Sequence, residues 1–401
     1  MKKVLMLLIL SFVVQANEAR LKAWTLHNRI AGVPPTPTVL NQMENMIVQN
    51  PGKVGLENAA SIALQNDYFY NVRLKNWLKP LSNEERSKNV PLNDFVATVI
   101  GAIRDSDNPN KPFSRVLYDD LIYVGPALGD QNRNFSRSNN NHYARIESEF
   151  LDLKNILVER MQSQNIDTEP NPDNNRRDQT NVVVNGINGA AGVLTTRAYG
   201  ESFYQAGTNR SVTRHTFMNF LCKDFEDLHD TTVPDFRVRR DVEREPGGDS
   251  RTYKNTCVGC HAGQDALGGA FAYWDYRNNR LRFTPGNVVD KMNHNALYDM
   301  GHVTTDNSWL NLWASGQNAN LGWRGPTTGN GVKEFGQMIA RSRQFSRCMS
   351  MKVFKLVCIR PPVEDDLPFI EEMADDFESN DSYNMKRLFA RTGAHCVEED
   401  I

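Results

Sequence analysis

One pentapeptide of this 401-residue chain combines two thiols and an imidazole at a chemically informative spacing, Cys257-Val-Gly-Cys260-His261. C-x-x-C-H is the pattern of covalent c-type haem attachment. Two thiols one helical turn apart can each add to a vinyl group of the same porphyrin, and the adjacent imidazole then faces the iron. A zinc site would need a second ligand pair, and a thioredoxin-like site would need a βαβ context; the surrounding sequence offers neither. The motif predicts one covalently bound haem c, with Cys257 and Cys260 as anchors and His261 as the proximal iron ligand.

The sixth iron ligand is less sharply defined by the sequence. Small monohaem cytochromes commonly place a methionine a few tens of residues after the motif, and Met300 satisfies that spacing. His302 and His294 are the alternatives, and an open sixth position is a further one. A methionine ligand would raise the reduction potential relative to a second histidine. Methionine at helical spacing is also ordinary core filling.

Four cysteines remain outside the motif: Cys222, Cys348, Cys358 and Cys396. In an oxidising compartment they can form two disulfides in three ways. Cys348 and Cys358 are expected on one helix, about 15 Å apart along its axis. A disulfide needs Cα atoms within about 7 Å, so these two cannot be joined. If all four pair, Cys222 joins one of them and Cys396 joins the other.

The first 16 residues have the composition of a secretory signal peptide. Lys2 and Lys3 precede an apolar run that ends at Val14-Gln15-Ala16, which is a charged start, a short apolar core and a small residue at the cleavage point. The run is about half the length needed to span a bilayer, so no transmembrane segment is expected after signal removal. We expect an exported protein, with the bacterial periplasm as the leading destination.

Composition is that of an ordinary globular protein. Basic residues number 46 and acidic residues 48, so the formal net charge is −2. A general nucleic-acid binder needs a clear excess of Lys and Arg, and no nucleic-acid partner is expected. The charged stretch from Arg237 to Arg251 is interpreted as a solvated, salt-bridged loop, with a docking patch for a partner or a haem propionate as the alternative.

Apolar periodicity predicts a mainly α protein. The clearest helical pattern runs from Tyr143 to Met161, and the segment from Phe113 to Tyr123 is expected to be helical too. The polar stretch 164–181 has little apolar surface to offset the entropy of ordering, which suggests a linker. The expected organisation is a signal peptide at 1–16, a multi-helical N-terminal domain at 17–163, a linker at 164–181, and a cytochrome c-like haem domain at 182–401 with long loops and a helical C-terminal end.

The neighbourhood of the motif resembles the C-terminal haem-binding modules of the large planctomycete-type cytochromes, an uncharacterised c-type family. The resemblance covers residues 185–395, and its most specific part is the haem segment through Asp265 and Gly268, followed by Tyr273-Trp-Asp275. Ala266 stands where that family has a turn proline, and Asn278 and Asn279 stand where it has a glycine. The resemblance implies an exported, largely helical haem protein and no substrate.

Three functions compete at this point. The first is a monohaem cytochrome that transfers single electrons to a redox partner protein of unknown identity. The second is a haem peroxidase or oxidase with an open sixth position, although no residue constellation identifies a catalytic group and none is predicted. The third is a cell-envelope interaction protein with a structural haem. The large helical N-terminal domain favours a partner-binding role for that region, with an envelope protein as its partner.

Overall fold

A computed structural model describes residues 18–126, 135–163, 189–205 and 207–401. The predicted signal peptide and the predicted linker at 164–181 both lie outside these residues. The described part is mainly helical, as expected. None of its helices combines the length and apolarity needed to cross a bilayer.

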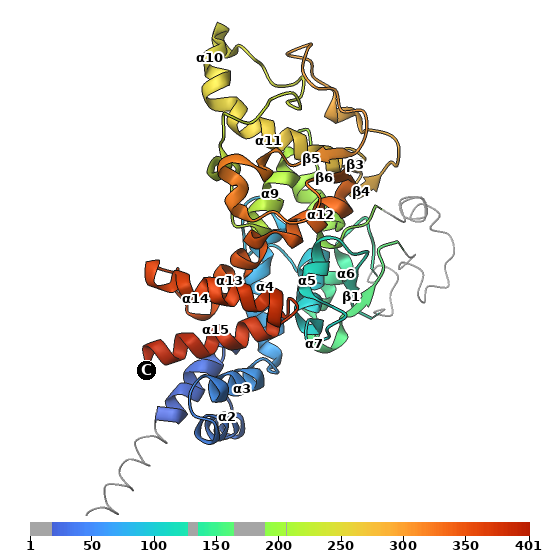
Figure 1. Cartoon of the computed structure of the whole chain (residues 1–401). Coiled ribbons are helices and arrows are strands. Elements are labelled where there is room, and N and C mark those ends of the chain that lie inside the picture. Colours follow the sequence, from blue (N-terminus) through green and yellow to red (C-terminus); the bar gives the residue numbers. More distant parts are fainter. Residues whose placement is uncertain (1–17, 127–134, 164–188, 206) are drawn as a thin grey trace, which may run out of the picture.

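Helices from the two ends of the described chain meet at one end of the molecule (Figure 1). Residues 18–31 form a first helix. It is followed by α2 (Pro37–Gln49) and α3 (Lys53–Ala63), and the last helix, α15 (Met385–Asp400), packs against α3. Pro37 occupies the first helical position of α2, where its missing N–H costs no hydrogen bond. The first and last segments of the chain therefore stabilise one another.

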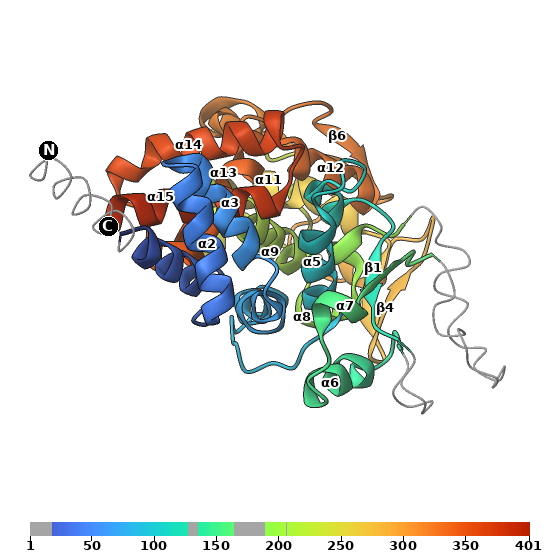
Figure 2. The ribbon, with the colours of Figure 1, turned by 90° about the horizontal axis from the view of Figure 1, so that it is seen from below.

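The middle of the N-terminal half packs around one buried helix. α5 (Asp94–Asp105) is buried along most of its length, and Asn93 caps it by accepting a hydrogen bond from the amide of Val96 at 3.1 Å. Figure 2 shows α5 between the N-terminal helices and the short helices and strands that follow it. The short helices of this region are η1 (Phe69–Leu74), α4 (Lys75–Leu78) and η2 (Lys79–Ser82) before α5, and η3 (Phe113–Leu117), α6 (Asn141–Ser148) and α7 (Leu153–Ile156) after it.

The second half is also built mostly of helices. Short helices and short strands come first, and longer helices then lead to the C-terminus. The elements are η6 (Gly192–Thr195), α8 (Arg197–Phe203), α9 (Arg210–Phe220), η7 (Phe225–Leu228), α10 (Ser250–Thr252), η9 (Tyr253–Cys257), α11 (Val258–Gly268), η12 (Leu312–Ala314), η13 (Gly316–Leu321), α12 (Gly331–Arg341), α13 (Arg343–Val357), α14 (Leu367–Asp375) and η15 (Asp376–Asn380).

Three two-stranded antiparallel sheets complete the described part. They pair β1 (Ile122–Val124) with β2 (Val158–Arg160), β3 (Trp274–Arg277) with β4 (Arg280–Phe283), and β5 (Ser308–Leu310) with β6 (Thr328–Asn330). Strands of three or four residues are too short to show an alternating apolar pattern, which is why periodicity did not predict them.

The predicted helix from Tyr143 to Met161 is wrong in its extent. The helix ends at Ser148, Phe150 adopts a left-handed backbone (φ 55°), and the chain resumes as α7 and then β2. Asn71, from a distant segment, accepts a hydrogen bond from the amide of Leu153 at 2.8 Å. Asp152 caps α7 by accepting from the amide of Lys154 at 3.1 Å. These side chains satisfy amides at the start of α7 and so fix a new helix where the apolar pattern predicts a continuous one.

The expected helix from Phe113 to Tyr123 is likewise shorter than predicted. The segment begins as the 3-10 helix η3, which ends at Leu117. Its end forms strand β1, which pairs with β2. β-branched and aromatic side chains suit a strand that is buried on both sides.

One hydrophobic core runs through the described part, with buried members from Ala19 to Val397. It includes side chains from both sides of the predicted linker. The domain boundaries at 17–163 and 182–401 stay a prediction, and the two regions share apolar packing.

Candidate functional site

The Cys257–His261 motif lies where a π-helical turn becomes an α-helix. α10, η9 and α11 follow one another without a break, and Asp249 caps their start by accepting a hydrogen bond from the amide of Arg251 at 2.9 Å. Cys257 is the last residue of η9, while Cys260 and His261 lie in the first turn of α11. Single π turns inside helices occur frequently at functional sites. The two thiols therefore lie one turn apart, as the motif requires.

Two glycines allow α11 to pack closely against its neighbours. A Cβ on Gly259 would lie 2.5 Å from Nε2 of His229, and a Cβ on Gly263 would lie 2.1 Å from Cε2 of Trp313. Both distances are below van der Waals contact, so only glycine fits on this face of the helix. Cys257, Cys260 and His261 are each half-buried, and their side chains remain accessible.

The cysteines divide as the spacing predicted. Cys222 is bonded to Cys348, and Cys358 is bonded to Cys396, with Cα atoms 5.3 Å apart in each pair. The prediction that Cys348 and Cys358 take different partners is confirmed. Cys257 and Cys260 alone stay unpaired. The chain thus places its only two free thiols on the helical turn that carries His261.

The Cys260 thiol is held in its protonated form. Burial raises its pKa, and the nearby carboxylates of Glu226 and Asp224 raise it further. Its S–H donates to the carbonyl of Phe225 at 3.5 Å.

His261 turns one ring nitrogen into the protein. Its Nδ1 is buried and has no hydrogen-bond partner within 3.5 Å, and the nearest carboxylate oxygen is Oδ2 of Asp265 at 3.7 Å. Among the described residues, Nε2 makes no hydrogen bond. A metal-ligating histidine typically directs one nitrogen at a carboxylate or carbonyl and keeps the other for the metal. Nδ1 therefore faces the Asp265 carboxylate, and Nε2 has no partner among the described residues.

Asp265 is fully buried and saturated with donors. Arg210 donates to both oxygens, at 2.6 and 2.9 Å, and Arg239 donates through its backbone amide at 3.0 Å and its side chain at 3.2 Å. Burial alone would raise the pKa of Asp265, but Arg239 and Arg210 hold it well below its usual range. The carboxylate is therefore ionised whenever the protein is folded near neutral pH. It presents a fixed negative charge to Nδ1 of His261.

Arg239 corrects the interpretation of the 237–251 stretch as a solvated loop. Only 1% of this residue is exposed, and its guanidinium also donates to the carbonyl of Thr208 at 2.7 Å and to Sδ of Met292 at 3.2 Å. The other charged residues of the stretch include exposed ones such as Glu243 and Glu245. Charge patterning could not distinguish Arg239 from its neighbours, because its role depends on a carboxylate 26 residues away.

The three proposed sixth ligands occupy different environments. Met300 is 83% exposed, and His294 is exposed as well. His302 is half-buried and forms a backbone bridge with Arg239, which connects it to the Asp265 cluster. Arg237 donates to Nε2 of His302 at 3.4 Å. The described structure thus brings only His302 close to the group around His261.

The aromatic side chains behind the motif pack on one another. The Trp313 ring lies 5.3 Å from Phe225 and 5.7 Å from Phe217, and Trp313 is fully buried. Trp309 contacts Phe335 in the same manner, edge to face at 6.2 Å. These rings form the protein core beneath α11.

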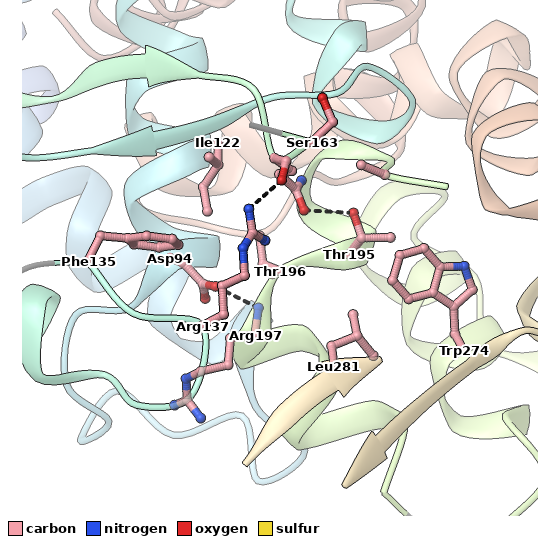
Figure 3. Close-up of a pocket in the computed structure, with 12 residues that line it drawn as sticks. Asp94, Ile122, Phe135, Arg137, Ser163, Thr195, Thr196, Arg197, Trp274 and Leu281 are labelled. Atoms are coloured by element: carbon pink, nitrogen blue, oxygen red, sulfur yellow. Dashed lines mark hydrogen bonds between the residues drawn. The ribbon is translucent and has the colours of Figure 1, made fainter. Parts of the chain in front are cut away.

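A cavity between β1, the 135–137 segment and the β3–β4 hairpin is too small for a cofactor (Figure 3). Its volume is about 30 Å³, which is room for water only. Asp94 on its wall accepts hydrogen bonds from the amides of Arg197 and Ala198, at 2.6 and 3.0 Å. The cavity is a small gap between packed side chains at the start of α8.

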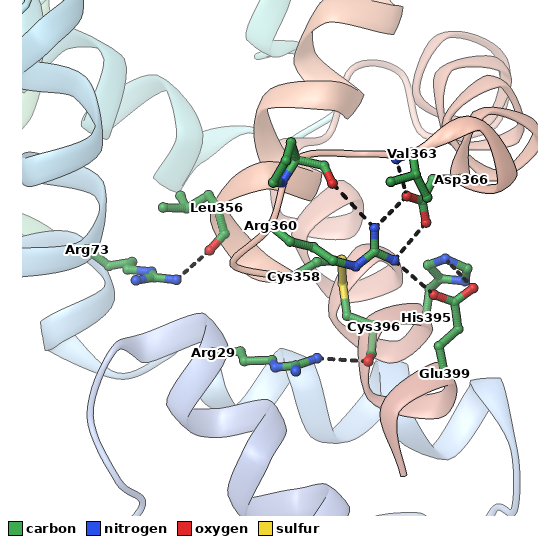
Figure 4. The surroundings of a disulfide bond; sticks show 11 residues. Arg29, Arg73, Leu356, Cys358, Arg360, Val363, Asp366, His395, Cys396 and Glu399 are labelled. Atoms are coloured by element: carbon green, nitrogen blue, oxygen red, sulfur yellow. Dashed lines mark hydrogen bonds and ion pairs between the residues drawn. A yellow bond between two sulfur atoms is a disulfide. The ribbon is translucent and has the colours of Figure 1, made fainter.

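A second cluster of ligand-type residues, not expected from the sequence, lies beside the Cys358–Cys396 disulfide (Figure 4). Asp366, His395 and Glu399 bring their ligand atoms within 4.8 Å of one another. Arg360 already donates to both Asp366 oxygens, at 2.5 and 2.8 Å, and to Glu399 at 3.4 Å. The guanidinium occupies the place of a cation, so the cluster is an ion-pair network. His395 and Glu399 lie one turn apart on α15, whereas Asp366 is about 30 residues earlier in the chain, in η14 (Glu364–Asp366).

Comparisons with protein families, with curated proteins and with solved structures find no match to this chain.

Proposed function

We propose that this chain is an exported c-type cytochrome that carries one covalently bound haem and transfers single electrons in the periplasm or cell envelope. The observation that carries the proposal is the division of the cysteines. Four are consumed by disulfides, and the two left free are those of the C-x-x-C-H motif, beside a histidine with its Nδ1 turned inward. Disulfides accompany oxidising compartments, which supports export.

Each motif residue has a defined task in this proposal. Cys257 and Cys260 form thioether anchors, and His261 holds the iron through Nε2. The haem, when bound, supplies one-electron redox chemistry. Asp265 orients the imidazole, and Arg210 and Arg239 fix Asp265. The protein's own hydrogen bonds to Asp265 support this arrangement.

The proposal includes the cytochrome c-like haem domain at 182–401 and its resemblance to the planctomycete-type modules. It assigns partner binding to the N-terminal helices. Figure 1 shows α2 and α3 at the opposite end of the molecule from α10 and α11. A protein bound at that end would leave the motif accessible to a separate redox partner.

Covalent haem attachment is tested by expression in an exporting host with c-type maturation machinery. We expect a haem-stained band on a denaturing gel, and its loss in the Cys257→Ser/Cys260→Ser double variant. The matched control, Cys358→Ser/Cys396→Ser, also removes two cysteines but leaves the motif intact, and we expect it to keep the stain. Absence of haem from the wild-type protein would overturn the proposal.

A haem enzyme with an open sixth position is the second candidate, and the exposure of Met300 and His294 favours it. A side chain in water cannot serve as an internal iron ligand without a rearrangement of its loop. The discriminating measurement is the reduced-minus-oxidised absorption spectrum with and without carbon monoxide, recorded alongside a His261→Ala variant. Carbon monoxide binding supports the enzyme, whereas a six-coordinate spectrum that carbon monoxide leaves unchanged supports the electron carrier. Met300→Ala and His302→Ala then identify the sixth ligand in the latter case.

A further inference from the structure

An open cavity beside α9 and α13 has four cations among its nine lining residues. Its volume is about 490 Å³, within the range of small-molecule sites. Arg86, Lys223, Lys352 and Lys355 contribute positive charge to its lining. The lining residues come from α4, the segment after η2, α9 with the residues that follow it, and α13, and Figure 1 shows α9 and α13 near the middle of the molecule.

Little negative charge balances these cations. Among the described residues, the side chains of Lys223, Lys352 and Lys355 form no ion pair and no hydrogen bond. The one carboxylate in the lining belongs to Asp224, and Arg214 already donates to both of its oxygens at 2.6 Å. The cavity therefore carries an excess of positive charge in a protein whose formal net charge is −2.

Lys352 is a half-buried cation in the cavity wall. Burial lowers its pKa to about 8, and the neighbouring charges of Arg86 and Lys355 act in the same direction. The residue is half-buried, so its ammonium group loses part of its hydration with no counter-ion among the described residues, which is destabilising. An anion in the cavity would relieve that cost.

The backbone around the cavity is unusual at two points. Arg86 and Cys222 both adopt left-handed conformations, with φ of 54° and 53°, although neither is glycine. Such strain is maintained only where the surroundings enforce it, and it clusters at functional sites. The disulfide to Cys348 holds Cys222, and a hydrogen bond of 2.7 Å to Asn219 holds Arg86. Both charged segments of the rim are thus fixed in place.

The remaining wall is apolar. Trp77, Met218 and Leu356 line the cavity beside the cations. An inorganic ion would leave that surface in water, whereas a small organic anion would cover it.

We propose that this cavity binds a small organic anion with at least two negative charges, a polycarboxylate or a phosphorylated compound. The charged groups contact Lys223, Lys352 and Lys355, and the carbon skeleton packs on Trp77 and Leu356. The site contains no residue of the Cys257–His261 motif, so this inference is independent of the haem proposal.

Isothermal titration calorimetry on the full chain at low ionic strength tests the site. Citrate serves as the polycarboxylate probe, pyrophosphate as the polyphosphate probe, and acetate as the monovalent reference. We expect one saturable site for at least one polyanion and much weaker binding of acetate. Tighter binding of citrate assigns a polycarboxylate, and tighter binding of pyrophosphate assigns a phosphorylated ligand.

Variants locate the binding. Lys352→Met should weaken the polyanion affinity about tenfold or more, since a charge-assisted hydrogen bond is lost. Lys53→Gln, which removes an exposed lysine of α3, is the matched control and should change it less than about twofold. Thermal unfolding shows whether each variant is folded. Lys355→Gln changes a second, exposed residue of the cavity. Unchanged affinity in both cavity variants, or polyanion binding as weak as that of acetate, would overturn the proposal.

Discussion

The Asp265 carboxylate lies 3.7 Å from Nδ1 of His261, one helical turn further along α11. Four hydrogen bonds from Arg210 and Arg239 hold this carboxylate in the interior. A carboxylate with so many donors has little remaining basicity, so it does not take a proton from the imidazole.

Asp265→Asn is expected to raise the midpoint potential of the haem-loaded protein. Loss of a buried negative charge beside the proposed iron ligand would destabilise the ferric state more than the ferrous state. Asp241→Asn is the matched control, because Asp241 also pairs with Arg210, at 2.6 Å, but makes no contact with His261. Spectroelectrochemical titration should find the larger shift in Asp265→Asn. Equal shifts would mean that the net charge of the cluster matters and that the contact with His261 does not.

Gly263→Ala should destabilise the protein by about 1–3 kcal/mol, since the new methyl group overlaps the buried Trp313 ring. Gly268→Ala, on the same helix, meets its nearest atom at 3.4 Å and should be neutral or stabilising by up to about 1 kcal/mol. Urea unfolding of both variants measures the difference. A similar loss of stability in the two would show that α11 does not pack closely on Trp313.

The two disulfides should contribute unequally to stability. The Cys222–Cys348 bridge spans 126 residues and the Cys358–Cys396 bridge spans 38. Loop-closure entropy predicts that removal of the longer bridge costs about 1 kcal/mol more than removal of the shorter one. Paired Cys→Ala variants compared by chemical unfolding test this order. Non-reducing peptide mapping gives an independent check, and a Cys348–Cys358 peptide would contradict the fold.

The contact that Glu147 of α6 makes with Lys75 and Lys79 should be sensitive to acid. Burial alone would raise its pKa, but hydrogen bonds from Lys79 (2.7 Å), the Leu92 amide (2.7 Å) and Lys75 (2.9 Å) lower the pKa to about 2. A depressed pKa stabilises the folded state above the unfolded pKa, and that contribution is lost as the pH falls from about 4.5 to about 2.

At neutral pH this contribution is at most about 3 kcal/mol, and partial exposure of the carboxylate reduces it. Glu147→Gln should therefore lower the free energy of unfolding at pH 7. In this variant the free energy of unfolding should also fall less steeply between about pH 5 and about pH 2. Glu18→Gln, which breaks an exposed pair with Lys22, should leave both nearly unchanged. Urea unfolding of both variants and the wild-type protein across this pH range measures the difference. The same pH dependence in Glu147→Gln and the wild-type protein would contradict the prediction.

The sequence alone was sufficient for features that depend on local chemistry. Helical periodicity predicted a mainly α protein, and the spacing of Cys348 and Cys358 on one helix excluded a bond between them. The C-x-x-C-H motif selected Cys257, Cys260 and His261 because its chemistry is contained within five consecutive residues. Periodicity failed where a distant side chain acts: Asn71 accepts a hydrogen bond from the amide of Leu153 at the start of α7, within a stretch where the apolar pattern predicts one helix up to Met161.

Tertiary structure decided which charges are buried and which partners they meet. Arg239 belongs to a charged stretch that has the composition of a solvated loop, yet it is enclosed with Asp265 because a buried carboxylate requires a buried cation. The choice of Cys348 for Cys222 and of Cys358 for Cys396, the exposure of Met300, and the gathering of Lys223, Lys352 and Lys355 around one cavity all depend on long-range packing. Periodicity and motif spacing report on neighbours in sequence, and these contacts join residues that are neighbours only in the folded protein.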